Sequence, residues 1–385
     1  MERRHFIKIG GLAATAGMIR PAFVPDGNDQ QADGLLQTIN FSTDGLGLNP
    51  QEYASLLGKQ AHEAKIAADY YSLGGAVEEL EQTFARLLAK ESAVFMPTGT
   101  LANHIAVRKL AGDNRRVLVQ AESHLYNDSG DCAGVLSGLN LIPLAAGQAT
   151  FTLEEVKGWV ERSAGGRVET KIGVLSIECP VRRKYHEVFD FAEMVKITSY
   201  AREHDIKLHL DGARLFNVPH HAGKKIEDYT SLFDTVYVSL WKCFNAASGA
   251  VLAGSKQFTD GLFHVRRMFG GSLPQAWPLV AVAAPYAGSY LDEYASAWKI
   301  ADGLVSGLQK DDRFKVEKLA NGTSIFKLSV AGITPDKFSE RLRMKRIVLP
   351  HPEKGSGLFW MTVNTSLNRA NPDTLAGSFL EAAKA

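Results

Sequence analysis

The 385-residue sequence has little cysteine, no surplus of charge of either sign and no long apolar run. Its three cysteines, Cys132, Cys179 and Cys243, are too few and too irregularly spaced for a disulfide framework or a zinc site. Lysine plus arginine (43) nearly balances aspartate plus glutamate (42), so no net field draws the protein to nucleic acid or to an acidic membrane. No apolar run is long enough to span a membrane. We therefore expect no metal, no nucleic-acid partner and no membrane contact in the mature protein.

The N-terminus differs from the rest of the chain. Arg3 and Arg4 precede a short, mildly apolar stretch, with Phe6 and Lys8 at the positions typical of a twin-arginine export signal. The alternative is a helix that frays at the start of the chain. The twin-arginine route carries proteins that are already folded. We predict that residues 1–33 are signal and linker and that the mature protein is periplasmic.

The remaining residues predict two folded parts. Helical and strand patterns alternate from residue 76 onward, which is typical of an α/β domain with a mainly parallel sheet, here residues 34–275 with an N-terminal arm. The pattern changes near residue 276, where a long helical stretch and shorter mixed elements predict a smaller α+β domain, residues 276–385. The predicted strands of the first part are short, apolar and rich in β-branched residues: 92–96, 117–119, 172–177, 206–210, 235–240 and 250–253.

A carboxylate closes one of these strands. Asp211 follows the predicted strand 206–210 and precedes Gly212, which frees the backbone to turn. Ligands of open α/β sheets gather at the carboxyl ends of strands, where a carboxylate can bind metal, act as a base or pair with a buried cation. Taken alone, an aspartate-glycine pair after a strand is more often only a turn.

A lysine closes the next predicted strand. Lys242 lies in weakly charged, aromatic surroundings, and an apolar strand continues beyond Gly249. A lysine in this position normally extends its ammonium group to the surface. Here no charged neighbour in the sequence solvates that group, and a partly buried lysine has a lowered pKa that makes it a competent nucleophile.

A hydroxyl-glycine-hydroxyl turn, Thr98, Gly99 and Thr100, joins strand 92–96 to a predicted helix. Free backbone N–H groups, the helix dipole and two hydroxyl donors would make this turn an anion site. A plain helix N-cap explains Thr98 or Thr100 equally well.

Together the three motifs resemble those of fold-type I pyridoxal-phosphate (PLP) enzymes, in the same order along the chain. The resemblance implies PLP as the cofactor. Lys242 would hold its aldehyde, Asp211 would keep the pyridine nitrogen protonated, and the turn Thr98–Thr100 would take the phosphate. A nucleotide-binding Rossmann fold is the competing α/β interpretation, but no Gly-x-Gly-x-x-Gly follows the first strand.

Within that group the sequence resembles the L-threonine aldolase and β-eliminating lyase branch, over about residues 39–285. The match within 208–217 is the most specific part. It is supported by Phe95–Asn103, by Lys242 with 249–254, and by 266–271.

The resemblance also implies roles around the cofactor ring. His124 would stack on the ring and relay protons from the substrate's β-hydroxyl; a solvated loop histidine is the alternative. Arg214 would bind the substrate carboxylate as a charge-assisted pair, unless it forms a structural ion pair. Ser239 would add a phosphate contact or be an ordinary buried hydroxyl. Glu178 would lie near the ring.

Two further residues are implied at the substrate. Thr43 stands where the family keeps a serine near the carboxylate. Tyr71 would approach the cofactor of a neighbouring subunit, which implies a homodimer or homotetramer.

The sequence departs from the aldolase pattern at three places. Cys179-Pro180-Val181 replaces Asn-Thr-His, so a histidine implicated in the retro-aldol step is missing. Trp360 lies near the position of the family's second carboxylate-binding arginine, and a proline replaces another arginine within 270–275. Arg182, with its neighbour Arg183, is the candidate replacement cation.

The resulting hypothesis is a PLP-dependent lyase that cleaves a β-hydroxy-α-amino acid to glycine and an aldehyde. His124, or a water that it orients, would remove the β-hydroxyl proton, and Lys242 or water would return a proton to Cα. The alternatives are a β-eliminating lyase, an aminotransferase, and a PLP-binding protein without turnover.

Overall fold

The main sheet contains the strands that the sequence predicts. A computed structural model describes residues 38–63 and 66–384, so the predicted export signal and the boundary at residue 33 lie outside the described residues. Within these ranges the main sheet has seven strands, in the order β2-β8-β7-β6-β5-β3-β4. Their bounds are β2 Ser92–Met96, β3 Arg116–Gln120, β4 Asn140–Leu144, β5 Ile172–Glu178, β6 Lys207–Asp211, β7 Thr235–Ser239 and β8 Ala250–Gly254.

Strand direction in this sheet is mainly parallel. The pairs β3–β4, β3–β5, β5–β6 and β6–β7 are parallel, and only β8 runs against its neighbours β7 and β2. Parallel neighbours require crossover connections, which the intervening helices supply. The predicted α/β fold with a mainly parallel sheet is confirmed.

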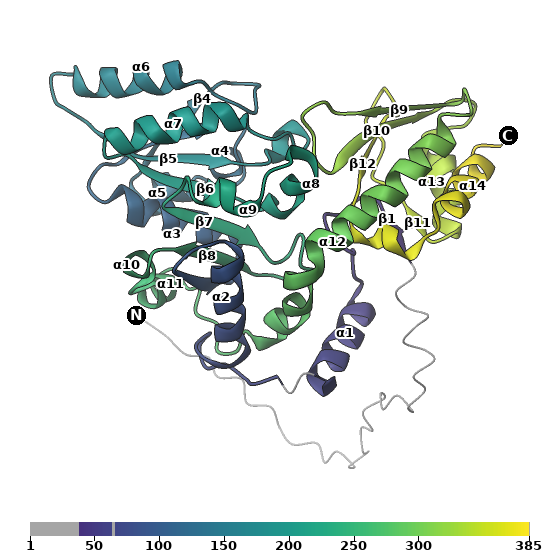
Figure 1. The fold of residues 1–385 in the computed structure, drawn as a ribbon, viewed down its shortest axis with the longest axis horizontal. Helices are drawn as coiled ribbons and strands as arrows, with labels where there is room; N and C mark the ends of the chain where they lie inside the picture. The colour runs from purple at the N-terminus through teal and green to yellow at the C-terminus, as the bar shows by residue number, and fades with distance from the viewer. Residues whose placement is uncertain (1–37, 64–65, 385) are drawn as a thin grey trace, which may run out of the picture. The chain divides into compact units, whose positions relative to one another are not determined.

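Helices cover both faces of the sheet (Figure 1). Helix α3 (Gly99–Ala111) packs on one face, while α2 (Gly75–Leu87) and α7 (Phe191–Glu203) pack on the other. Side chains of β8 alternate between them: Val251 and Ala253 join the core with α2 and α7, whereas Ala250 and Leu252 join the core on α3. The other helices around this sheet are α4 His124–Asn127, α5 Cys132–Ser137, α6 Leu153–Ala164, α8 Val218–Ala222, α9 Ile226–Thr230, α10 Lys256–Thr259 and α11 Leu262–Met268, with 3₁₀ turns η2 Arg182–Lys184 and η3 Leu215–Asn217.

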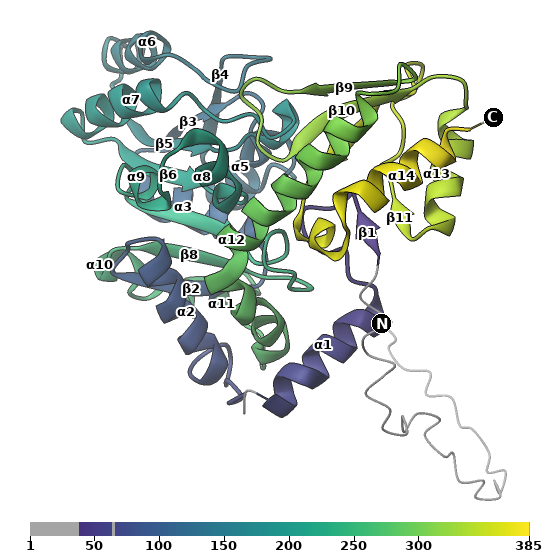
Figure 2. The same cartoon turned by 45° about the vertical axis from the view of Figure 1, so that its right-hand side comes forward.

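A long helix, α12 (Trp277–Leu308), runs from α2 toward a smaller antiparallel sheet (Figures 1 and 2). That sheet has the order β12-β10-β9. Its surroundings include a short pairing between β1 and β11, which brings the N-terminal segment beside the C-terminal part. The bounds are β9 Phe314–Lys318, β10 Ile325–Val330, β11 Ile347–Val348, β12 Phe359–Thr362, α13 Pro335–Met344, α14 Pro372–Ala382, η4 Thr365–Arg369, β1 Ile39–Asn40 and α1 Pro50–Glu63.

The predicted α+β content after residue 276 agrees with this arrangement. The division into domains at that residue stays a prediction. Neither α12 nor any other helix in the described part of the chain is long and apolar enough to cross a membrane.

Three strands were not predicted from the sequence, β1, β4 and β9, and β1 has only two residues. Strand β4 lies at the edge of the main sheet and pairs only with β3. Its exposed Asn140 and its Pro143 weaken the apolar pattern, and both are tolerated because one side of an edge strand needs no partner. Strand β9 is also an edge strand, with three exposed residues among its five. Strands β4 and β9 therefore lack the continuous apolar signal that revealed the central strands and the edge strand β2.

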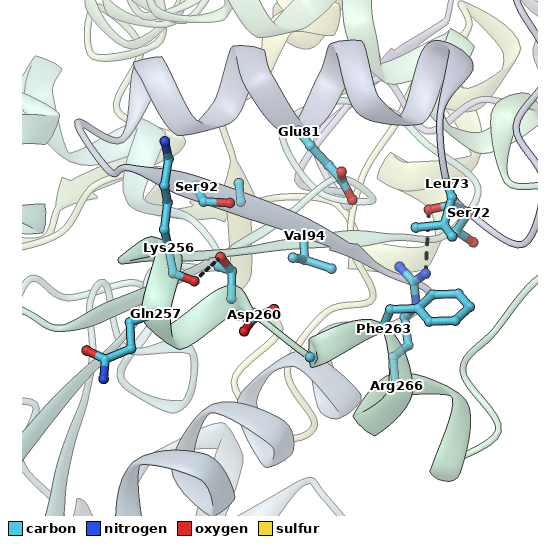
Figure 3. A pocket seen from close by; sticks show the side chains of 13 residues that line it. Ser72, Leu73, Glu81, Ser92, Val94, Lys256, Gln257, Asp260, Phe263 and Arg266 are labelled. Carbon is cyan, nitrogen blue, oxygen red and sulfur yellow. Dashed lines mark hydrogen bonds between the residues drawn. The ribbon is translucent and has the colours of Figure 1, made fainter.

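A cavity of about 700 Å³ lies at the open edge of β2 (Figure 3). Arg266 of α11 is fully buried and donates from Nη1 to the Phe95 carbonyl at 2.5 Å. Glu81 of α2 accepts from the Phe95 backbone N–H at 2.6 Å. The two side chains thus satisfy backbone groups that an added strand would otherwise pair with. Burial raises the pKa of Glu81 to about 7.

This raised pKa predicts a pH-dependent stability. Glu81 in the folded protein prefers its protonated form, so its contribution to stability is present below the ordinary glutamate pKa and is lost as pH rises through about 7. Glu81→Gln keeps a neutral acceptor for Phe95 and removes this titration. We expect the unfolding free energy of the natural protein, relative to Glu81→Gln, to fall between pH 5 and pH 8 in urea titrations. Glu79→Gln, at an exposed position of the same helix, is the control, and a difference independent of pH would contradict the prediction.

Candidate active site

A cavity of about 1230 Å³ opens where the parallel strands of the main sheet end. Its wall combines the N-terminal segment 42–50, the start of α3, the loop 241–249 and two residues from the smaller sheet, Ile325 and Thr362. Ser239, the last residue of β7, also lines it. The cavity therefore lies where ligands of open α/β sheets bind.

Lys242 presents its amine to this cavity. The Nζ atom has no hydrogen-bond or ion-pair partner among the described residues, and it is not among the buried atoms that lack one. Burial lowers the pKa of Lys242 to about 8, and the nearby Arg214 guanidinium acts in the same direction. A substantial neutral fraction near physiological pH is what a nucleophilic amine needs.

Asp211, the last residue of β6, is buried and held by a chain of hydrogen bonds. Asn103 Nδ2 donates to Asp211 Oδ2 at 2.5 Å, and Asn103 Oδ1 lies 2.9 Å from His209 Nε2. Because the Asn103 oxygen can only accept, His209 carries its proton on Nε2, and His209 Nδ1 accepts from the Thr235 hydroxyl at 2.8 Å. Burial lowers the pKa of His209 to about 4, so the ring stays neutral. The chain fixes the carboxylate in one orientation.

The predicted anion turn opens α3 beside the cavity. Thr98 is the N-cap: its hydroxyl accepts from the Leu101 N–H at 3.2 Å, which is the capping role left open above. Gly99 packs against Tyr237, and a Cβ at position 99 would lie 1.9 Å from the Tyr237 hydroxyl oxygen. Gly99 and Thr100 both line the cavity. Their N–H groups belong to the first turn, which has no helical acceptors, so an anion can bind there.

Arg214 forms a bidentate ion pair with Asp44. Its Nε and Nη2 donate to the two carboxylate oxygens at 2.7 and 2.8 Å. Burial alone would raise the pKa of Asp44, but the guanidinium overrides it and holds that pKa well below its usual range. Nη1 has no partner among the described residues and is not sealed from solvent. The structural ion pair therefore uses one edge of Arg214 and leaves another for the cavity, which Arg214 lines.

Glu178 connects two loops at the cavity mouth. One carboxylate oxygen accepts from the His124 backbone N–H at 2.6 Å, and the other from the Arg182 N–H at 2.9 Å. Burial raises the pKa of Glu178 to about 7, and the negative charge of Asp211 adds to the effect. His124 and Arg182 line the cavity, whereas Glu178 lies behind them. The Arg182 guanidinium also pairs with Asp128 at 3.3 Å.

Of the remaining predicted site residues, Thr43 and Ser239 line the cavity and Tyr71 does not. Thr43 lines the cavity, and its hydroxyl donates to the Gly45 carbonyl at 2.8 Å. Ser239 lines it as a buried hydroxyl. Tyr71 does not line the cavity of its own chain; its ring lies 5.2 Å from the Arg267 guanidinium. The roles of all three stay predictions.

Four residues of this site were not predicted from the sequence: Asp44, Asn103, His186 and His209. Asp44 and Asn103 left weak signals: a carboxylate beside Thr43, and a polar side chain on the buried face of a helix. His209 resembles any polar residue inside a buried strand. His186 lines the cavity and is almost fully buried, but it arrives there through a turn that no sequence pattern revealed.

These residues fit the cofactor that the resemblance implies. An unpartnered amine and an open helix N-terminus border one cavity. The fixed carboxylate of Asp211 lies behind its wall, close enough to Lys242 to interact with its charge. The amine, the carboxylate and the helix N-terminus match in turn an aldehyde, a pyridinium nitrogen and a phosphate. Among residues 38–63 and 66–384, no cluster of histidine, cysteine or carboxylate side chains could hold a metal ion.

Comparison with known families decides the classification. Residues 54–331 match the model of the beta-eliminating lyase family. The chain belongs to this family.

Individual members of the family show the same relationship. The low specificity L-threonine aldolase of Saccharomyces cerevisiae is 29% identical over 225 residues, which cover 58% of this chain and 57% of the yeast protein. This chain thus spans a little over half the length of that relative. The low-specificity L-threonine aldolase 1 of Arabidopsis thaliana is 25% identical, over 74% of this chain and 81% of the plant protein. A crystal structure from Exiguobacterium sp. 255-15, named as an aromatic amino acid beta-eliminating lyase/threonine aldolase, superimposes with a TM-score of 0.75. It is 25% identical and covers 92% of this chain and 99% of that one.

The chain of hydrogen bonds beneath Asp211 predicts a large effect of Asn103. Asn103→Ala leaves the Asp211 carboxylate and the His209 N–H without their partners inside the core. We expect the unfolding free energy to fall by about 2–4 kcal/mol in chemical denaturation. Asn140→Ala, at an exposed edge-strand position, is the control and is expected to change it by less than about 0.5 kcal/mol. Equal effects of the two substitutions would contradict this interpretation.

Proposed function

We propose that the protein is a PLP-dependent lyase that cleaves a β-hydroxy-α-amino acid to glycine and an aldehyde. The observation that carries the proposal is the unpartnered Lys242 amine, in one cavity with the first turn of α3 and beside the buried Asp211. Family membership and the threonine aldolase relatives support the reaction class.

Different residues of the site would bind the aldehyde, the pyridine nitrogen and the phosphate of PLP. Lys242 would bond to the aldehyde, and Asp211 would pair with the pyridine nitrogen. The N–H groups at the start of α3, with Thr100 and Ser239, would donate to the phosphate. His124 would cover the ring face. When bound, PLP accepts the electron pair released as a bond at the substrate's Cα breaks.

The chain's own side chains would orient the substrate and move its protons. Arg214 Nη1 would bind the substrate carboxylate, because Asp44 already holds the other edge of the guanidinium. Burial lowers the pKa of His124, so its ring is neutral at physiological pH and can accept the proton of the β-hydroxyl, directly or through a water. Lys242 Nζ or water would return a proton to Cα.

The second candidate reaction is β-elimination. Two observations favour it. The chain matches the beta-eliminating lyase family, and Val181 stands where the aldolase pattern has a histidine. Elimination would require a substrate with a leaving group on Cβ and would release pyruvate and ammonia. Arg182, near the mouth of the cavity, is the cation that would meet a polar side chain of such a substrate.

The assembly and location of the enzyme are also proposals. We propose a homodimer or homotetramer in which Tyr71 reaches a neighbouring cavity, since it lies away from its own. We propose export by the twin-arginine route, on the motif at Arg3 and Arg4. Replacing both arginines by lysine should confine the protein to the cytoplasmic fraction; a periplasmic location of that variant would contradict export by this route.

The reaction predicts specific products. Purified PLP-loaded protein, incubated with L-threonine or L-allo-threonine, is expected to form glycine and acetaldehyde in equal amounts. Lys242→Ala is expected to lower kcat at least ~100-fold, because it removes both the attachment point and a proton donor. Lys256→Ala, at an exposed lysine outside this cavity, is the control.

The same assay separates the two candidate reactions. If neither threonine yields products, and serine or cysteine derivatives yield pyruvate and ammonia, the protein is an eliminating lyase and not an aldolase. If none of these substrates yields products, both the aldolase and the β-eliminating lyase are contradicted.

A further inference from the structure

A substrate carboxylate at this site can find donors besides Arg214. Asp44 takes the Nε–H and one N–H of Nη2, so the two N–H groups of Nη1 and one of Nη2 remain for the cavity. At the position where the resemblance expects a second arginine, the chain has Trp360, which does not line the cavity. Trp360 instead stacks on Tyr185, with ring centroids 3.6 Å apart and planes 6° from parallel.

Tyr185, one of the two stacked residues, belongs to an unusual turn. Tyr185 and His186 have φ values of 53° and 62°, a left-handed conformation that is costly for side chains of their size. Hydrogen bonds hold it: His186 N–H donates to the Val181 carbonyl at 3.0 Å, and the His186 carbonyl accepts from the Thr323 N–H and hydroxyl at 3.2 and 3.0 Å. Backbone strain that the surroundings enforce so firmly is typical of functional sites.

The turn places the His186 ring in the wall of the cavity, in a fixed orientation. Nδ1 lies 2.7 Å from the Ser324 hydroxyl, which can donate to it. Nε2 has no partner among the described residues, and it is not among the buried atoms that lack one, so it faces accessible space. His186 lines the cavity, and it is close enough to Arg214, Asp44 and Lys242 to interact with their charges.

We propose that His186 is a specificity-determining residue: its Nε2–H donates to the substrate carboxylate, alongside Arg214 Nη1. In this arrangement Ser324 donates to Nδ1 and thereby keeps the proton on Nε2. The bend that precedes β10, through Ser324, thus contributes to substrate recognition without contacting the substrate. The proposal rests on the proposed function and names a residue that selects amino acids over amines lacking a carboxylate.

The charge state of the ring is compatible with this role. Burial lowers the pKa of His186 to about 3, and Arg214 adds to that effect while Asp44 opposes it. The ring is therefore neutral at physiological pH, and a neutral imidazole with its proton on Nε2 is a hydrogen-bond donor. A substrate carboxylate between Arg214 and His186 would accept hydrogen bonds from one cation and from one neutral donor.

Paired ligands test the proposal. Glycine and methylamine both offer an amine to bound PLP, but only glycine has a carboxylate. Their dissociation constants are measured from the absorbance change of the PLP-loaded protein, which requires no turnover. His186→Leu is expected to weaken glycine binding about tenfold or more and to leave methylamine binding unchanged. His186→Gln, which keeps an N–H donor, should lose less, and Trp360→Ala should show the same selectivity because it releases the turn.

Controls distinguish the possible failures. His264→Leu, at an exposed position outside the cavity, should change neither constant. Equal weakening of glycine and methylamine by His186→Leu would overturn the proposal, as would unchanged glycine binding with a lower kcat. A natural protein that takes up no PLP would overturn the proposed function, and this proposal with it.

Discussion

The desolvation of one amine is the constraint on which the rest of the site depends. Lys242 is half-buried, without a hydrogen-bond partner in the described part of the chain, and its pKa is lowered to about 8. A core would normally exclude such a group or pair it with a carboxylate. Here Asp44, a carboxylate close enough to interact with that charge, is held by Arg214 instead. The ion pair therefore keeps the amine available and at the same time orients the guanidinium.

The surroundings of the cavity are rigid for reasons that can be traced to single contacts. Asp211 is fixed through Asn103 to a neutral His209, and the loops that contain His124 and Arg182 share the carboxylate of Glu178. These groups come from strands β5 and β6, helices α3 and α4 and the turn η2. A site assembled from rigid elements holds its reacting groups in place without a cost at the moment of reaction.

The sequence predicts the main sheet well because buried parallel strands have continuous apolar patterns. It also predicts Asp211 and the turn at Gly99, since each lies directly at the end or start of such an element. Lys242 does not close a strand as expected, because β7 ends at Ser239 and Lys242 lies in the turn that follows. The partners of these residues could not be predicted in the same way. Asp44 and Arg214 are 170 positions apart, and only the fold brings them together.

His186 is the clearest limit of sequence-based prediction in this chain. The motif that places a histidine in the aldolase relatives reads Cys179-Pro180-Val181 here, so a histidine is expected to be missing. The structure brings another histidine to the cavity through two consecutive left-handed residues, and such a turn has no signature when neither residue is glycine.

The central claim is that the Lys242 amine bonds to the PLP aldehyde, and chemical trapping tests it most directly. Borohydride reduction of the PLP-loaded protein, followed by mass spectrometry of its peptides, should place the pyridoxyl label on Lys242. Lys90 and Lys109, whose pKa values burial also lowers, serve as internal controls and should stay unlabelled. A protein that remains unlabelled, or that carries the label on another lysine, would contradict the account.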